Sequence, residues 1–152
     1  MISLKFQTKR DQFFIVFWIV TLIIINLGFL LPLLGGGKSW GDTIVVIILD
    51  LLFTVFFIWL DVDLSYVVKN DYLLVKGGIF RSKIKYEDIT KISGKPNIWA
   101  GYRMIFSRDA IEIFYKTGFM GSVIISPVNK TLFIQELVRR NNQIKIEGFD
   151  KD

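Results

Sequence analysis

The first sixty residues are dominated by two long apolar segments, at about 13–34 and 43–60. Neither segment shows the alternation of apolar and polar side chains that is typical of a half-buried strand. Because about 20 helical residues cross the hydrocarbon core of a bilayer, each segment is long enough to span it. The pattern predicts an N-terminal tail and a two-helix transmembrane hairpin over residues 1–60.

From residue 61 onward the chain consists of short runs rich in β-branched and aromatic residues, separated by turn residues. The runs are LSYVV, YLLVK, SKIKY, YRMIF, IEIFY and SVIIS. Apolar residues then recur at helical spacing after Pro127 or Asn129, either of which can start a helix. The pattern predicts an α+β protein in which residues 61–152 form an antiparallel barrel or sandwich with a C-terminal helix packed on it.

Charged side chains are unevenly distributed: residues 1–60 hold 7 of the 33, and residues 61–152 hold the other 26. This asymmetry indicates two regions in different solvents. A cleaved signal peptide is the alternative for the first apolar segment, which follows Lys5, Lys9 and Arg10. We favour a retained helix, because the segment exceeds the usual apolar core of about 7 to 15 residues and no Ala-x-Ala cleavage site follows.

Basic residues also predict the orientation of the hairpin. Three of them precede the first helix, only Lys38 lies in the connection, and Lys69 and Lys76 soon follow the second helix. Since cytoplasmic segments carry an excess of Lys and Arg, we expect a multi-pass protein of the cell membrane with both termini in the cytoplasm.

The chain contains no cysteine and no histidine. This excludes disulfides, thiolate nucleophiles, His-assisted serine chemistry and Cys or His zinc sites. The GGGKSW stretch at 35–40 does not fit a phosphate-binding loop, which would need glycine where Pro32 stands. We therefore nominate no catalytic residue, no metal site and no cofactor.

Two stretches, VVKNDYLLVKGGIFRSKIKYEDITKI and IEIFYKTGFMGSVIISPVNKTLFIQELVRRN, resemble the YyaB-like bacterial pleckstrin-homology (PH)-like domain family. The resemblance covers about residues 62–141. It rests on the order of a Gly-hydrophobic step, a YEDI entry into the next strand, and a serine-proline before the last helix. It implies a PH-like antiparallel β-barrel closed by the C-terminal helix, anchored to the membrane and without established enzymatic activity. It implies no particular ligand, since a shared fold does not transfer function.

The stretch IFRSKIKY is the clearest candidate for binding chemistry. Arg81, Lys83 and Lys85 recur every second residue, so that a strand projects them from one face, and Lys76 can extend the patch. One interpretation is a half-exposed strand whose cations keep the edge soluble. The other is a site for anionic lipid headgroups, where each basic residue near the bilayer contributes about 1 kcal/mol.

Trp99, in GKPNIWAGYRM, is a second candidate. Its indole would suit a protein partner or the membrane interface, and the alternative is core packing at the start of a strand. Residues 61–152 hold 15 Lys and Arg against 11 Asp and Glu, without a nucleic-acid recognition motif. We therefore expect membrane lipids as partners, and no nucleic acid.

Asp50 lies in the middle of the second apolar segment, where an ionisable side chain is costly and usually functional. A hairpin places Asp50 and Asn26 at a similar depth, about 12 Å from the connection. We predict an intramembrane polar pair in which Asn26 donates a hydrogen bond to Asp50, with Thr54 assisting. Contact with a second copy in a homodimer, and a proton or ion site, stay open as alternatives.

These patterns predict a membrane-anchored cytoplasmic PH-like module that binds or scaffolds at the bilayer surface and is not an enzyme. Its partners would be anionic lipid headgroups or a membrane protein. Two alternatives from other classes are a self-protection (immunity) or stress-resistance membrane protein, and an accessory subunit of a transporter.

Overall fold

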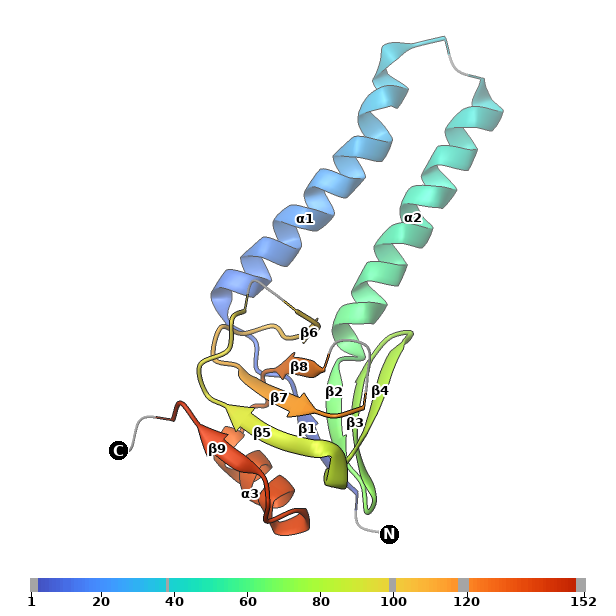
Figure 1. Ribbon diagram of the computed structural model, residues 1–152. Helices are drawn as coiled ribbons and strands as arrows, with labels where there is room; N and C mark the ends of the chain where they lie inside the picture. The colour runs from blue at the N-terminus through green and yellow to red at the C-terminus, as the bar shows by residue number, and fades with distance from the viewer. Residues whose placement is uncertain (1–2, 38, 99–100, 118–120, 150–152) are drawn as a thin grey trace.

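A computed structural model of the chain describes residues 3–37, 39–98, 101–117 and 121–149. Two helices project together from one end of a pair of β-sheets (Figure 1). They are α1 (Gln12–Leu30), continued by the 3₁₀ turn η1 (Leu31–Gly35), and α2 (Trp40–Val62). Both are long and apolar enough to cross a membrane, which confirms the two predicted helices.

Polar caps fix where each long helix begins. The Asp11 carboxylate accepts a hydrogen bond from the backbone N–H of Phe14 (3.0 Å) and caps α1. Ser39 and Asp42 form a reciprocal capping box at the start of α2. These caps satisfy N–H groups that a helix leaves without internal partners. Most of the large apolar side chains on the outer sides of both helices are exposed.

The strands form two sheets with orders β1-β2-β3-β4 and β6-β8-β7-β5-β9. The first sheet contains β1 (Leu4–Gln7), β2 (Ser65–Val68), β3 (Tyr72–Gly77) and β4 (Phe80–Lys85). The second contains β5 (Ile89–Ser93), β6 (Arg103–Met104), β7 (Ile111–Tyr115), β8 (Ser122–Ile125) and β9 (Lys145–Glu147). The short 3₁₀ turn η2 (Tyr86–Asp88) leads from one sheet to the other.

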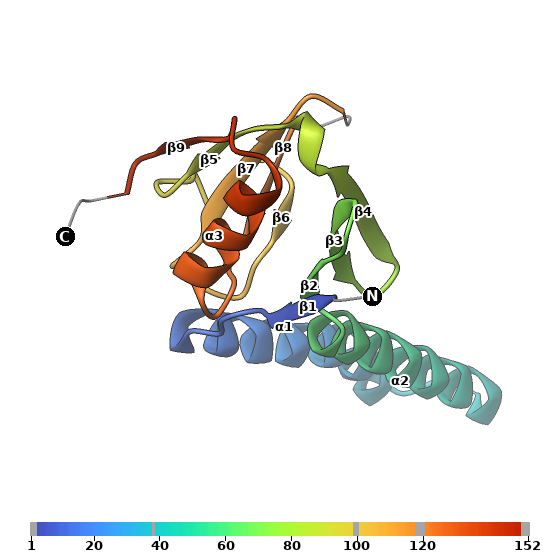
Figure 2. The ribbon, with the colours of Figure 1, turned by 90° about the horizontal axis from the view of Figure 1, so that it is seen from below.

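The predicted closed antiparallel barrel is wrong. Among the described residues the two sheets share no ladder, and β6 pairs with β8, and β5 with β9, in parallel. The reason is that η2 turns the chain out of the first sheet after β4, and β6 is only 2 residues long. No ladder therefore joins the edge strands β4 and β6 in the described ranges (Figure 2), although the Ser82 hydroxyl donates to that of Tyr102 (3.3 Å) beside them.

The helix α3 (Lys130–Arg140) is capped by Asn129, one of the two starts that the sequence allowed, and the Asn129 side chain accepts from the backbone N–H of Leu132. Its Phe133 and Leu137 are fully buried, and the Phe133 ring packs edge-on against Phe6, with 5.1 Å between ring centroids. The helix thus packs into the core between two open sheets. It does not close a barrel, because the two sheets do not form one.

The strand β1 places residues from both sides of the helical hairpin in one sheet. It precedes α1, yet it pairs antiparallel with β2, which follows α2. Phe6 on β1 is buried in the same core as Tyr66 on β2. The pattern of apolar and polar residues predicted no strand before the first helix. The hairpin is therefore inserted between two neighbouring strands and is attached to the domain at both ends.

Candidate functional site

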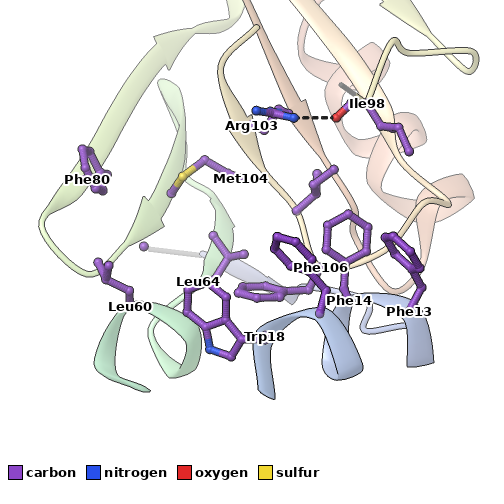
Figure 3. Close-up of a pocket in the computed structure, with 13 residues that line it drawn as sticks. Phe13, Phe14, Trp18, Leu60, Leu64, Phe80, Ile98, Arg103, Met104 and Phe106 are labelled. Atoms are coloured by element: carbon purple, nitrogen blue, oxygen red, sulfur yellow. Dashed lines mark hydrogen bonds between the residues drawn. The ribbon is translucent and has the colours of Figure 1, made fainter. Parts of the chain in front are cut away.

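A cavity of about 410 Å³ lies where the two helices meet the opening between the sheets. Figure 3 shows its walls, which come from the beginning of α1, the end of α2 and the facing edges of both sheets. The lining residues are Phe13, Phe14, Phe17, Trp18, Leu60, Leu64, Gly77, Phe80, Ile98, Arg103, Met104, Ile105 and Phe106. We call this space the junction cavity. Arg103 is the one charged residue among these described lining residues.

The aromatic side chains of the junction cavity connect the helices to the sheets. The Trp18 ring on α1 lies 5.6 Å from that of Phe57 on α2, centroid to centroid, and 5.6 Å from that of Phe106 in the domain. Such edge-on and tilted aromatic pairs add about 0.5–1.5 kcal/mol to the area that they bury. The wall of the cavity thus also holds the hairpin against the domain.

The β3–β4 turn brings an exposed apolar tip to the end of α2. Gly78 has a φ of +55°, and a Cβ atom at this position would collide with the side chain of Leu60 on α2. The positive φ of the turn therefore favours glycine, and a larger residue would also have to displace the Leu60 side chain. At the tip, Ile79 and Phe80 are 60% and 50% exposed. The tip thus adds two large exposed apolar side chains beside the end of an apolar helix.

The strand β4 carries the predicted basic residues outward from this tip. Ile84 is buried, whereas Arg81, Lys83 and Lys85 are exposed on the opposite face. The cations follow one another along the strand, so only Arg81 lies next to the tip. It also sits directly across from Lys76 in the β3–β4 ladder.

Three of these four predicted cations have partners. Lys76 forms an ion pair with Asp63 (2.7 Å), and Lys85 forms one with Glu87 (3.3 Å). The Lys83 ammonium lies 5.7 Å from the centroid of the Tyr72 ring. Arg81 pairs with no carboxylate in the described part of the chain, so it is the member of the set that is most available to an external anion.

Ion pairs also join the bases of the two helices to each other and to the domain. Arg10, just before α1, pairs with Asp61 in the last turn of α2 (2.9 Å). Lys9 pairs with Asp109 (2.6 Å), which is also paired with Lys130. Burial by itself would raise the pKa of Asp109, but the hydrogen bonds from the two lysines outweigh it and hold the pKa below its ordinary value.

Comparison with known proteins agrees with this architecture. Residues 64–141 match the family described as Bacterial PH domain. The chain belongs to the bacterial PH domain family. It is similar to the uncharacterized protein YyaB of Bacillus subtilis (strain 168), with 36% identity over 141 residues that cover 93% of this chain and 95% of that protein. No solved structure matches it.

The two comparisons differ in how much of this bacterial PH domain protein they cover. The family match begins after α2 and so leaves out β1 and the hairpin. The similarity to YyaB extends over nearly the whole chain and therefore over the hairpin as well. The predicted family is thus confirmed, and the strand that completes the first sheet lies outside the matched 64–141 segment.

The predicted polar pair within the hairpin has a different geometry in the structure. Asn26 donates to the Thr54 hydroxyl (3.2 Å) and to the Leu22 carbonyl (2.8 Å). Among the described residues no hydrogen bond joins Asn26 to Asp50. Asp50 is only 9% exposed, and its Oδ1 atom has no hydrogen-bond partner within the described chain.

Trp99 lies outside the described residues, as does Lys38. No group of three or more acidic metal-ligating side chains gathers anywhere in the described ranges. Sequence reasoning missed the junction cavity and Arg103, because the lining residues come from five separate segments of the chain. The Gly-Gly-Ile-Phe turn was visible in the sequence, but its position beside α2 depends on the packing of Gly78 against Leu60.

Proposed function

We propose that this protein is a membrane-anchored binding module of the bacterial PH domain family, with its domain held against the cytoplasmic face of the membrane. The hairpin crosses the bilayer, and residues 3–11 and 63–149 lie on the cytoplasmic side. The observation that supports this proposal most strongly is the Ile79–Phe80 tip, exposed and apolar beside the last turn of α2. In this placement the tip enters the interface between lipid headgroups and acyl chains, where aromatic side chains are favoured.

The basic face of β4 then contacts anionic headgroups in a graded manner. The strand rises by about 3.3 Å per residue, so Lys85 lies about 13 Å farther along it than Arg81. Figure 1 shows β3 and β4 extending away from the helices. Because screening limits the reach of a charge to about 8 Å at physiological ionic strength, Arg81 should contribute most to lipid contact and Lys85 least.

A second candidate function, contact with another membrane protein, is favoured by the buried Asp50. A carboxyl group with an unpartnered oxygen inside an apolar hairpin is costly unless another chain supplies the missing partner. The sequence also suggested two alternatives, a self-protection protein and an accessory subunit of a transporter. Both would act through contact with another chain, and both stay predictions.

The absence of cysteine allows single labels to test the placement of the tip in the whole chain. The full protein carrying Ile79→Cys with a bimane label is placed in lipid nanodiscs that contain doxyl-labelled lipid. Strong quenching at position 79 is expected, together with little quenching for the matched Ile146→Cys, since Ile146 is also an exposed isoleucine but lies on β9. Equal quenching at both positions would contradict the proposed placement.

The contribution of the basic strand is tested in the same samples. Adding phosphatidylglycerol to neutral nanodiscs should increase quenching at position 79, and Arg81→Gln should remove most of this increase. Lys85→Gln is the matched control and should leave the increase almost unchanged. An equal effect of the two substitutions would contradict the graded contact. If phosphatidylglycerol does not change the quenching, the basic residues of β4 only face solvent and do not bind lipid.

A further inference from the structure

The junction cavity adjoins the outer surface of α1. Phe13 and Phe17 line the cavity and are 40% and 55% exposed. Together with Val16 and Val20 they also line an adjoining shallow hollow on the outer side of the helix. If the hairpin spans the membrane, as proposed above, this side faces lipid. Phe13 and Phe17 thus form an apolar wall common to the cavity and to the lipid-facing hollow, so an acyl chain entering from the bilayer would meet only apolar side chains there.

Arg103 gives the cavity one positively charged end. Its guanidinium donates one hydrogen bond to the Ile98 carbonyl (3.0 Å), and among the described residues its other N–H groups, of five in all, have no acceptor. None of the described carboxylates pairs with Arg103. The cations at the helix bases differ in this respect, since Lys9, Arg10 and Lys76 are each paired with an aspartate.

Size and chemistry both select the class of ligand. The volume of about 410 Å³ falls within the usual range of about 300–1,000 Å³ for small-molecule sites. The wall is apolar and aromatic, which suits an acyl chain, and a guanidinium matches the oxygens of a phosphate better than an ammonium does. No acidic residue lines the cavity among the described residues, so nothing there repels an anion.

We infer that the junction cavity holds an acyl chain of a phosphate-bearing membrane lipid, with the lipid phosphate bound by Arg103. This inference rests on the proposed function, because it requires the hairpin to place the cavity at the bilayer. It adds a single-lipid site to the graded surface contact of β4. A bound lipid would fill the opening between the two sheets and join the helices to both of them.

The test measures lipids retained by the full chain in native mass spectrometry, after delipidation and re-addition of one lipid. The two probes are dioleoyl phosphatidylglycerol and dioleoylglycerol, which share acyl chains and differ in the phosphate group. Wild-type protein should retain the phospholipid more strongly. Arg103→Gln should reduce phosphatidylglycerol retention about tenfold, because a charge-assisted hydrogen bond is lost, while dioleoylglycerol retention stays the same.

A second variant tests the cavity itself. Ile105→Trp adds side-chain volume to the wall and should reduce retention of both lipids, and Ile105→Phe should do so to a lesser extent. Two matched controls lie on α3, away from the cavity: Leu132→Trp and Arg139→Gln should retain both lipids as the wild type does. Thermal melting identifies folded variants, and a folded Ile105→Trp or Ile105→Phe protein with wild-type retention of both lipids would overturn the inference.

Failure of this inference can be separated from failure of the proposed function. If the label at position 79 is quenched but substitutions at Ile105 and Arg103 leave lipid retention unchanged, the lipid lies only on the outer helix surface. The cavity site would then be wrong. Equal loss of both lipids in Arg103→Gln would likewise overturn phosphate binding. An unquenched label at position 79 would contradict the membrane placement itself.

Discussion

Asp50 is the least satisfied ionisable residue of the helical hairpin. Its side chain is buried in the α1–α2 contact, and Oδ1 has no partner in the described chain. A buried polar group without a partner costs about 1–3 kcal/mol, and an apolar residue of similar shape removes that cost. In the single chain, Asp50→Leu should therefore raise the free energy of unfolding by about this amount, measured by titration with a denaturing detergent.

A control one helical turn away should change stability in the opposite direction. Thr54→Val removes the hydroxyl that accepts from Asn26, and hydrogen bonds within membrane helices contribute about 0.6 kcal/mol on average. A loss of stability in Asp50→Leu, accompanied by loss of a dimer or of a bound membrane protein, would show that the carboxyl group has its partner in another chain.

Asp109 provides a pH-dependent test of the attachment of the N-terminal segment. Its folded pKa lies below the ordinary value of 3.8, because ion pairs with Lys9 and Lys130 favour the charged carboxylate despite partial burial. The stabilisation is therefore fully present above about pH 4 and is lost as the pH falls through the folded pKa.

Asp109→Asn should lower the free energy of unfolding at neutral pH by about 1 kcal/mol, as expected for partly exposed ion pairs. The difference from wild type should shrink below pH 4 and vanish in stronger acid. Thermal melts of both proteins across this pH range provide the measurement, and a difference that is independent of pH would show that these ion pairs do not stabilise the fold.

At the scale of elements, the strand β1 determines which part of the chain can fold alone. It supplies one edge of the first sheet and the buried Phe6, although it precedes the hairpin. A fragment that starts at residue 61 lacks both and should be strongly destabilised, since loss of a buried phenylalanine alone costs about 3–5 kcal/mol.

A matched deletion separates the strand from the hairpin. Replacing residues 12–60 with a short Gly-Ser linker retains β1, and the ends are close because Arg10 and Asp61 are paired at 2.9 Å. This variant should give a folded, soluble domain by circular dichroism and amide exchange, whereas residues 61–152 alone should not. Equal folding of the two proteins would show that β1 is dispensable.

The elements that the sequence predicted are those with a strong local pattern. The two apolar segments, the alternation around Ile84 and the start of α3 at Asn129 each follow from neighbouring residues. In contrast, β1 and β9 are 4 and 3 residues long and are defined by pairing with distant segments. Local periodicity carries no information about such pairings.

The candidate sites show the same limit at finer scale. Counting residues from the connection placed Asn26 and Asp50 at a similar depth, but depth does not fix the rotation of each helix, and Asn26 meets Thr54 instead. The junction cavity depends on segments brought together by folding, so no contiguous motif contains it. The family resemblance suggested a barrel, whereas the short β6 leaves the sheets open beside the helices.

At the scale of the whole molecule, the two attachments of the hairpin are the central feature. Because α1 follows β1 and α2 leads into β2, both helix bases are fixed to the same sheet. Figure 1 shows the domain gathered at one end of the hairpin. The exposed tip of β3–β4, the available Arg81 and the junction cavity all lie at this end. A domain held in this way presents one defined face toward the hairpin, and the proposed function places this face against the membrane.

Labelling of single cysteines in intact cells tests this arrangement most directly. Leu34→Cys places a thiol between the helices at a residue that is 82% exposed, and Ile146→Cys places one on the domain. With a membrane-impermeant maleimide, position 34 should react in intact cells, and position 146 should react only after the membrane is opened. Reaction of both positions under the same condition would contradict a membrane-spanning hairpin with a cytoplasmic domain.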